Sequence, residues 1–182
     1  MKIGLIVGSL RKDSFNRKVA EVVQGLFPAG VQAEFIDITN LPFYNADLDG
    51  DNPHPEYARV REELKKYDGY IFFTPEYNRS YAPAAKNVID LGSLDPKGSP
   101  WNGKPAAVFS ASVGTYGAMA ANQALRQVFI NTNLIPYQSP EVYLARIGES
   151  FDENGNMIED TRAFLQEAVY GFVKFSQGIQ NI

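Results

Sequence analysis

Short apolar runs rich in branched residues alternate along this chain with segments whose apolar residues recur at helical spacing. Strands buried on both faces are apolar throughout, so this alternation is typical of a parallel sheet covered by helices on each side. We expect strands at about 2–7, 32–37, 69–74, 105–111 and 134–142. We expect a first helix from about Asn16 to Leu26 and a last helix from about Thr161 to Gln177. Between them we expect a helix with an apolar stripe of Tyr57, Val60, Leu64 and Tyr67, and another that begins at Pro83. A further helix should contain the inward-facing residues Ala121, Leu125, Val128 and Phe129.

Five strands alternating with five helices predict an α/β chain with the flavodoxin-like fold. This fold is a three-layer sandwich in which a five-stranded parallel sheet of order 2-1-3-4-5 carries helices on both faces. We expect residues 1–182 to form a single domain of this kind. Ligands of such sheets bind beyond the carboxyl ends of the strands, where the strand order reverses. Residues 8–16, 75–80 and 112–117 should therefore meet in one crevice.

Residues 38–55 form an unusually long connection between two predicted elements. Connections of this length are usually either functional or loosely ordered. The only histidine of the chain, His54, lies in this connection between two prolines, and we expect it to be an exposed loop residue.

The chain has no cysteine and one histidine. This composition excludes thiolate nucleophiles, disulfides, iron–sulfur clusters and metal sites built from cysteines or from several histidines. We therefore expect no metal site. Redox chemistry would need a bound cofactor, because the side chains present cannot carry electrons.

The formal net charge of −4 argues against a general nucleic-acid binder. No apolar run approaches the ~20 residues of a membrane-spanning helix. The strand pattern begins at residue 2 and leaves no room for a signal peptide. We therefore expect a cytoplasmic protein without a membrane or nucleic-acid partner.

The loop after the first strand supplies the groups that hold a phosphate monoester. Arg11 can bind two oxygens at once, and Ser9, Ser14 and Asn16 offer short polar contacts at the start of a helix. The loop lacks both the Gly-Lys-Ser/Thr pattern of ATP-binding loops and the three-glycine fingerprint of dinucleotide folds. A second interpretation is a simple turn, with a capped helix and a solvated basic face.

The loop after the third strand, residues 74–83, also lies at a carboxyl end and should face the ligand. Pro75 stiffens it, Tyr77 offers a flat apolar surface, and its backbone N–H groups can bond the edge of a planar heterocycle. The alternative is a turn in which Ser80 caps the next helix and Glu76 pairs with Arg79 in solvent.

The loop after the fourth strand contains Gly114 and Gly117, which permit a close approach of the backbone to a ligand. A lone Gly-x-x-Gly is weak evidence. Its value comes from the fold, which brings all three loops to the same crevice.

The three motifs, in order, resemble those of the NADPH-dependent FMN reductase family, the flavodoxin-like group that includes FMN-binding quinone, azo-compound and chromate reductases. They are residues 8–17, residues 74–80 with 86–90, and residues 112–117, and the resemblance spans nearly the whole chain. It implies FMN as cofactor, NADPH or NADH as co-substrate, small-molecule electron acceptors such as quinones, and a homodimer or homotetramer. Family members often have a second glycine where this chain has Ala118.

The resemblance also implies which residues bind the cofactor. Four of them would hold the FMN phosphate, namely Ser9, Arg11, Ser14 and Asn16, with Phe15 beside them. The segment that would border the isoalloxazine ring consists of Pro75, Glu76, Tyr77 and Asn78. The residues that would complete the pocket are Ser112, Gly114 and Gly117.

Hydride transfer needs no general base, so we assign no catalytic acid or base. One open face of the flavin would serve both substrates in turn, which predicts ping-pong kinetics. We also expect several polar residues near the second loop to find partners across a homodimer interface, namely Glu76, Arg79, Lys86, Asn87 and Asp90. The alternatives on the same fold are a flavodoxin-type carrier of single electrons and a non-redox regulator.

Overall fold

The computed structural model describes residues 1–180 and contains the predicted parallel sheet. Its strand order is β2-β1-β3-β6-β7, and β8 also pairs with β6. All of these pairs are parallel. The predicted order is therefore confirmed. The strands of this sheet are β1 (Lys2–Val7), β2 (Gln32–Phe35), β3 (Gly69–Thr74), β6 (Pro105–Ala111), β7 (Ile135–Pro136) and β8 (Val142–Leu144).

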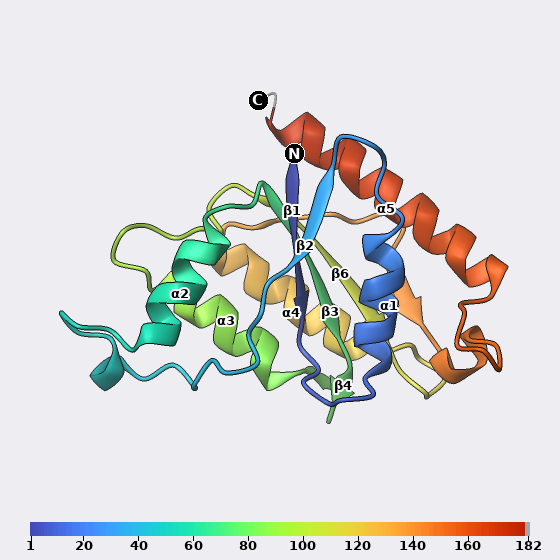
Figure 1. The fold of residues 1–182 in the computed structure, drawn as a ribbon, viewed down its shortest axis with the longest axis horizontal. Coiled ribbons are helices and arrows are strands. Elements are labelled where there is room, and N and C mark those ends of the chain that lie inside the picture. The colour runs from blue at the N-terminus through green and yellow to red at the C-terminus, as the bar shows by residue number, and fades with distance from the viewer. Residues whose placement is uncertain (181–182) are drawn as a thin grey trace.

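Helices cover both faces of the sheet and make a three-layer sandwich (Figure 1). Helices α1 (Phe15–Gln24) and α5 (Glu159–Gln180) pack on one face, and α2 (Pro55–Leu64), α3 (Pro83–Ser93) and α4 (Met119–Thr132) pack on the other. Successive residues of a strand point to opposite faces. In β3, accordingly, Phe73 joins the core under α1 and α5, whereas Phe72 joins the core under the other three helices.

The last strand differs from its prediction. The sequence predicts one strand over about 134–142, but the structure has two short pieces, β7 and β8, on the same side of β6. Pro136 and Pro140 lie at the end of β7 and between the two pieces. Proline has no N–H to donate to a neighbouring strand, so an unbroken ladder through this segment is impossible.

The sequence pattern does not predict the hairpin that follows β3. Strands β4 (Glu76–Tyr77) and β5 (Ser80–Tyr81) pair antiparallel through a two-residue turn. Asn78 and Arg79 both have positive φ, of 51° and 67°, as a type I′ turn requires. Asparagine tolerates this conformation well, but arginine rarely adopts it, so the sequence gives no strong signal for this turn.

Residues at the helix starts act as caps. Ser14 caps α1, and its hydroxyl accepts a hydrogen bond from Arg17 N–H. His54 is partly buried rather than an exposed loop residue, and its Nδ1 accepts from Glu56 N–H at the start of α2. The two short 3₁₀ helices are η1 (Ala46–Leu48) and η2 (Ile147–Ser150).

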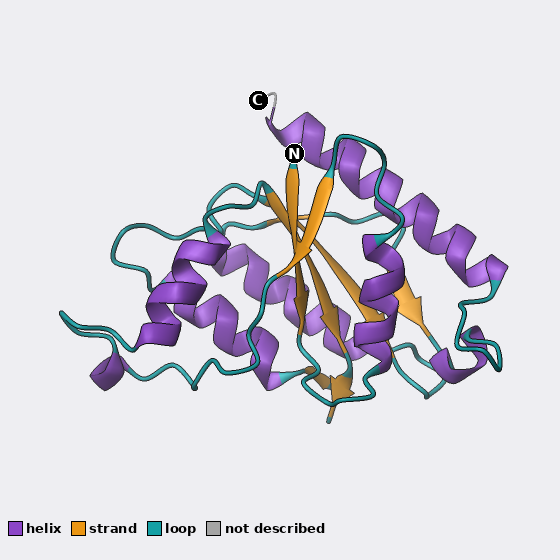
Figure 2. Cartoon of the chain, viewed as in Figure 1, coloured by secondary structure: helices purple, strands orange, loops and turns teal. Residues whose placement is uncertain are grey.

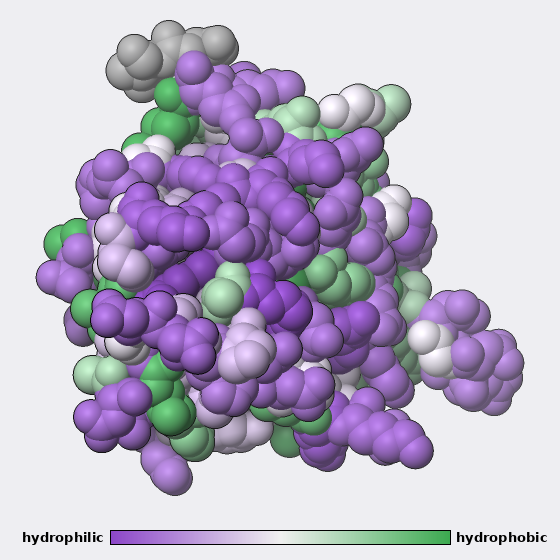
Figure 3. Space-filling model, turned by 60° about the vertical axis from the view of Figure 1, so that its left-hand side comes forward, coloured by the Kyte–Doolittle hydropathy of each residue, from purple (hydrophilic) through white to green (hydrophobic). Residues whose placement is uncertain are grey.

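The arrows of β1, β3 and β6 point toward the same lower edge in Figure 2, where the loops that follow them gather. This is the edge at which the sequence predicts the ligand crevice. Figure 3 brings the α2 and α3 side of the molecule forward and shows a mostly hydrophilic surface with small, scattered apolar groups.

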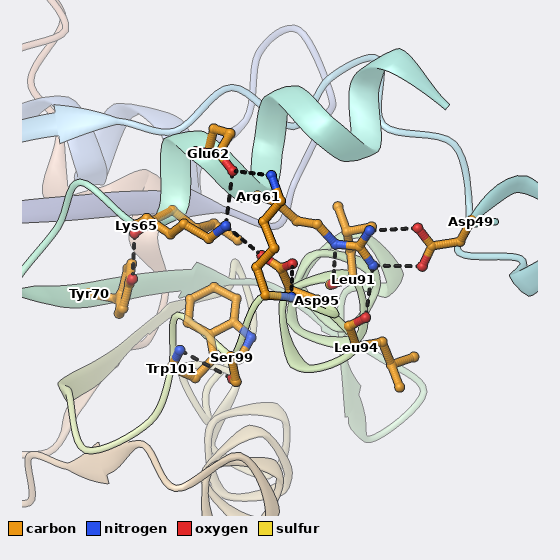
Figure 4. Close-up of polar contacts among 12 residues, drawn as sticks. Asp49, Arg61, Glu62, Lys65, Tyr70, Leu91, Leu94, Asp95, Ser99 and Trp101 are labelled. Atoms are coloured by element: carbon orange, nitrogen blue, oxygen red, sulfur yellow. Dashed lines mark hydrogen bonds and ion pairs between the residues drawn. The ribbon is translucent and has the colours of Figure 1, made fainter. Parts of the chain in front are cut away.

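The long connection 38–55 is ordered and attached to the helices beside it. Asn87 of α3 accepts from Tyr44 N–H at 2.7 Å, and its amide nitrogen donates to Pro42 O at 3.0 Å. Farther along, Asp49 forms a bidentate ion pair with Arg61 of α2, with N···O distances of 2.5 and 2.6 Å (Figure 4). The side chains of this pair are only 5% and 7% exposed for Arg61 and Asp49.

Arg61 also donates to the carbonyl oxygens of Leu91 and Leu94, so one guanidinium joins α2, the end of α3 and the connection (Figure 4). Its hydrogen bonds to Asp49 hold the pKa of that carboxyl below its ordinary value. Because the folded-state pKa is depressed, the ion pair stabilises the protein above the pKa of the unfolded carboxyl, and this stability is lost as the pH falls through the folded pKa.

We predict that Asp49→Ala lowers the free energy of unfolding at pH 7 by about 3 kcal/mol, because it leaves a buried guanidinium without its counter-charge. Urea denaturation measures the loss. The difference from the wild type should shrink as the pH falls below ~4, where the unfolded carboxyl is protonated. Asp51→Ala, an exposed acid of the same connection, is the control and should change little. Equal losses in the two variants would contradict the prediction.

Candidate functional site

A pocket of about 260 Å³ lies where the loops after β1, β3 and β6 meet, and we call it the central pocket. It brings together nine of the predicted site residues: Ser9, Arg11, Ser14, Phe15, Asn16, Pro75, Glu76, Tyr77 and Ser112. Its remaining lining residues are Ala111, Val113 and Ile147.

One end of the central pocket is the N-terminus of α1. The first N–H groups of a helix have no partner within the helix, and the helix dipole makes this end positive. The hydroxyl oxygen of Ser14 accepts a hydrogen bond from one of these N–H groups, that of Arg17. Arg11 lies in the same loop, is exposed, and donates from Nη2 to Asp13 O at 2.5 Å, which leaves further donors of its guanidinium for a ligand. This end suits an anion with several oxygens.

Asn16 ties this end of the pocket to the next loop. Its amide nitrogen donates to Ala111 O, at the end of β6, over 3.1 Å. The side chain is buried, and its Oδ1 has no hydrogen-bond partner among residues 1–180. An unpaired buried acceptor at a pocket wall is costly unless a ligand or water donates to it. A hydroxyl group of a bound ligand would meet this need.

The hairpin β4–β5 forms the second wall, and Glu76 holds it in place. Its carboxylate accepts hydrogen bonds from the N–H groups of Ala120 and Ala121 at 3.1 and 3.3 Å. These are in the first turn of α4, whose own N-cap residue, Ala118, has no side chain that can cap. Glu76 therefore caps α4 from another loop. The solvent-exposed pair with Arg79, the alternative interpretation of this loop, is not among the ion pairs of residues 1–180. Ser80 lies in β5 and does not cap α3, which has no side-chain cap.

The third wall is the turn before α4, in which Gly117 and Ala118 both have positive φ, of 58° and 60°. A Cβ on Gly117 would lie 2.5 Å from the carbonyl carbon of Tyr143, so this turn packs directly against β8. The hydroxyl of Ser110 in β6 donates to Gly117 O at 2.7 Å and thereby attaches the turn to the sheet. The position of Gly117 is thus explained by packing against the sheet.

A second pocket, of about 480 Å³, continues from the central pocket, and we call it the rim pocket. The two pockets share Glu76 and Ser112. The predicted residues Asn78 and Gly114 line the rim pocket, as do Arg79, Thr115, Tyr116 and Ala118. Gly117 lines neither pocket.

Large apolar side chains remain exposed around the two pockets. Tyr77 is 50% exposed, Tyr116 69% and Val113 71%. Exposed apolar groups gathered at a pocket usually mark a binding surface. Together with the anion-binding end, they give the site a polar end and a flat apolar end. This arrangement fits a ligand that has a phosphate at one end and a planar ring at the other, as FMN does.

Some lining residues carry no signal in the sequence. Ile147 reaches the central pocket from η2, beyond β8, and nothing in its local pattern indicates this. Val113 lies within the predicted third loop, but its apolar side chain predicts core rather than surface.

Among residues 1–180 there is no group of three or more histidine, aspartate or glutamate side chains placed to hold a metal ion. Within the same residues, no helix has the length and apolar character needed to cross a membrane.

Comparison with known proteins gives consistent matches. The model of the family described as NADPH-dependent FMN reductase matches residues 1–149. A quinone reductase of Pseudomonas putida is 40% identical over 173 residues, which cover 95% of this chain and 93% of that protein. A 2-hydroxy-1,4-benzoquinone reductase of a Burkholderia species is 40% identical over 168 residues, 91% of each chain. The solved structure of FerB, a flavoenzyme NAD(P)H:(acceptor) oxidoreductase from Paracoccus denitrificans, has a TM-score of 0.89 at 35% identity and covers 97% of both chains.

We predict that Glu76→Ala lowers the free energy of unfolding by about 1–2 kcal/mol, because the first turn of α4 loses its charged cap. Thermal and urea denaturation measure this loss. Glu76→Gln keeps an acceptor oxygen and should lose less. Glu153→Ala removes an exposed acid of the turn between η2 and α5 and serves as the control. A Glu76→Ala variant as stable as the wild type would refute the capping role.

Proposed function

The chain belongs to the NADPH-dependent FMN reductase family, and on that premise we propose that residues 1–182 act as a single FMN-binding domain. The enzyme takes hydride from NADPH or NADH and delivers electrons to quinones or similar small acceptors. The observation that carries this proposal is the central pocket, whose anion-binding end and apolar rim match the two ends of FMN. The quinone-reductase names of two relatives support the class of acceptor.

In this proposal the FMN phosphate lies at the N-terminus of α1. Arg11 and the hydroxyls of Ser9 and Ser14 bind it, together with the first backbone N–H groups of the helix, next to Phe15. Asn16 contributes its unpaired Oδ1, which is suited to accept a hydrogen bond from a hydroxyl of the ribityl chain.

The residues that would border the isoalloxazine ring, toward the rim pocket, are Pro75, Glu76, Tyr77 and Asn78 on one side and Ser112 and Gly114 on the other. Gly117 lines neither pocket and supports this second side only through the turn before α4. FMN, when bound, supplies the capacity to accept a hydride and to release electrons. The chain's own residues bind and orient it, and the apolar side chains of Tyr77 and Val113 exclude water from its edge. None of them has to act as an acid or base.

We also propose that the protein works as a homodimer or homotetramer, although the structure changes the argument for it. Most of the residues expected to lack partners have them within the chain, since Glu76 caps α4, Lys86 pairs with Asp90 and Asn87 binds the long connection. Exposed apolar side chains, and not these polar residues, support an oligomer. Three exposed apolar side chains line one pocket of about 360 Å³ beside the central pocket, namely Leu10, Phe43 and Tyr77.

A cytoplasmic location is part of the same proposal, because NADPH and NADH are the reductants of that compartment. Cell fractionation tests it.

We predict that the wild type binds FMN far more tightly than riboflavin, because riboflavin lacks the phosphate. Arg11→Ala should weaken FMN binding about ten- to one-hundred-fold, the value of a charge-assisted hydrogen bond, without affecting riboflavin. Fluorescence titration measures both ligands. Lys12→Ala removes a neighbouring positive charge that does not line the pocket and is the matched control. Equal affinity of the wild type for the two flavins would refute the phosphate assignment.

We predict ping-pong kinetics, because NADPH and the acceptor would use the same open face of the flavin. Initial rates measured over a grid of NADPH and benzoquinone concentrations should give parallel double-reciprocal lines. Each substrate should inhibit at high concentration. Intersecting lines would contradict a shared site. The absence of steady NADPH oxidation with a soluble quinone would instead favour a flavodoxin-type electron carrier.

We predict that sedimentation at micromolar concentration shows a species of at least twice the 20.2 kDa mass of the chain. Phe43→Asp places a charge in the apolar group and should yield monomer. Tyr170→Asp alters an exposed aromatic residue of α5, on the opposite face of the sheet, and should leave the assembly intact. A wild-type monomer at this concentration would remove the oligomer from the proposal.

A further inference from the structure

A third pocket at the same edge of the sheet lies between the ends of β1 and β2, on the other side of the first loop from the central pocket. We call it the β2 pocket. Its volume is about 450 Å³. The side chains that give it its chemistry are Ser9, Arg11, Arg17, Asp37 and Thr39, with Phe35 as an aromatic wall. It shares Ser9 and Arg11 with the central pocket, so the two adjoin.

The β2 pocket has a positive charge that the FMN site does not use. Arg17 lines the β2 pocket but not the central pocket. Its guanidinium lies over the Phe35 ring, with Cζ 3.7 Å from the ring centroid, and its Nε donates to Glu21 at 2.9 Å. These contacts fix the plane of the guanidinium. A planar, oriented guanidinium is suited both to bind phosphate oxygens and to stack against a heterocyclic base.

The same pocket also contains a fixed carboxylate. Asp37 follows β2 by two residues, and its Oδ1 accepts the N–H of Thr39 at 2.9 Å. This backbone hydrogen bond holds the pKa of Asp37 below its ordinary value, and the nearby Arg59 and Arg17 act in the same direction. Asp37 is therefore ionised at neutral pH. An ionised carboxylate is an acceptor only, so Asp37 in the wall of this pocket can accept hydrogen bonds from the hydroxyls of a ribose.

A guanidinium that is stacked on an aromatic ring and can bind phosphate, together with a carboxylate that can bind ribose hydroxyls, matches one chemical class. We propose that the β2 pocket binds the adenosine-phosphate half of the nicotinamide dinucleotide and that Asp37 selects the form with a free ribose 2′-hydroxyl. Arg17 binds the phosphates, and a 2′-phosphate is disfavoured because it would bring a second negative charge against Asp37. The inference rests on the proposed function for its ligand, and it makes NADH the preferred reductant.

Calorimetric titration of the FMN-saturated protein with 5′-ADP and with 2′,5′-ADP tests the pocket without any electron transfer. Saturation with FMN keeps both probes out of the central pocket. The wild type should bind 5′-ADP, and 2′,5′-ADP at least about tenfold more weakly, because of like-charge repulsion. Asp37→Asn should remove most of this difference. Its matched control, Asp13→Asn, changes an exposed acid of the first loop that lies outside the pocket and should preserve the difference.

Arg17→Gln should weaken 5′-ADP binding about tenfold, the effect of losing a charged hydrogen-bond donor. Lys12→Gln removes a positive charge from an exposed position outside the pocket and should weaken 5′-ADP binding by less than twofold. No binding of either probe to the wild type would overturn the proposal. Equal losses in the two variants, or an Asp37→Asn variant with unchanged discrimination, would overturn it as well.

The kinetic counterpart is the ratio of kcat/KM for NADH to that for NADPH, which should fall about tenfold in Asp37→Asn. The two proposals fail in different ways. A protein that binds 5′-ADP as described but does not oxidise NADH with a quinone would refute the proposed function and leave the pocket standing. A protein that turns over steadily but binds neither probe would refute the pocket alone.

Discussion

The parallel pairing of β1 with β3 and of β3 with β6 is the constraint on which the site depends. Parallel alignment places the carboxyl ends of the three strands at one edge, so the loops that follow them must meet. Segments more than a hundred residues apart in sequence, at Ser9 and Ser112, thereby line the same pocket. None of the three loops forms this pocket alone.

Hydrogen bonds between the loops then hold the crevice open in a defined shape. Asn16 joins the start of α1 to the end of β6, and Glu76 joins the β4–β5 hairpin to the first turn of α4. Ser110 fixes the turn at Gly117. Each bond satisfies a backbone group that would otherwise lack a partner at the end of a strand or helix. The polar residues of this region thus have structural roles as well as places in the pocket walls.

The elements that sequence reasoning predicts well are those set by local pattern. The first four strands of the sheet follow from runs of apolar residues. The features it misses depend on distant residues or on rare backbone conformations. Glu76 looks like a partner of Arg79 in sequence, because the N–H groups that it caps are more than 40 residues away.

The candidate site follows the same division. Arg11 and Tyr77 line the central pocket, as the sequence predicts, because their loops follow the carboxyl ends of parallel strands. The contribution of Ile147 is not, because it requires knowing how the chain returns after β8. Pro136 and Pro140 explain why the last strand is split. Hydrophobicity alone predicts one continuous strand for this segment, because it does not take the missing N–H groups of the prolines into account.

That split has a consequence for how molecules of this protein meet one another in a crowded solution. A long exposed edge strand offers a row of unpaired N–H and C=O groups, to which a strand from another molecule can add. Here one margin of the sheet consists of two short pieces separated by a proline-containing segment, and the other is the four-residue β2. Neither margin provides a continuous template for strand addition. The break in the last strand therefore protects the sheet against edge-to-edge aggregation.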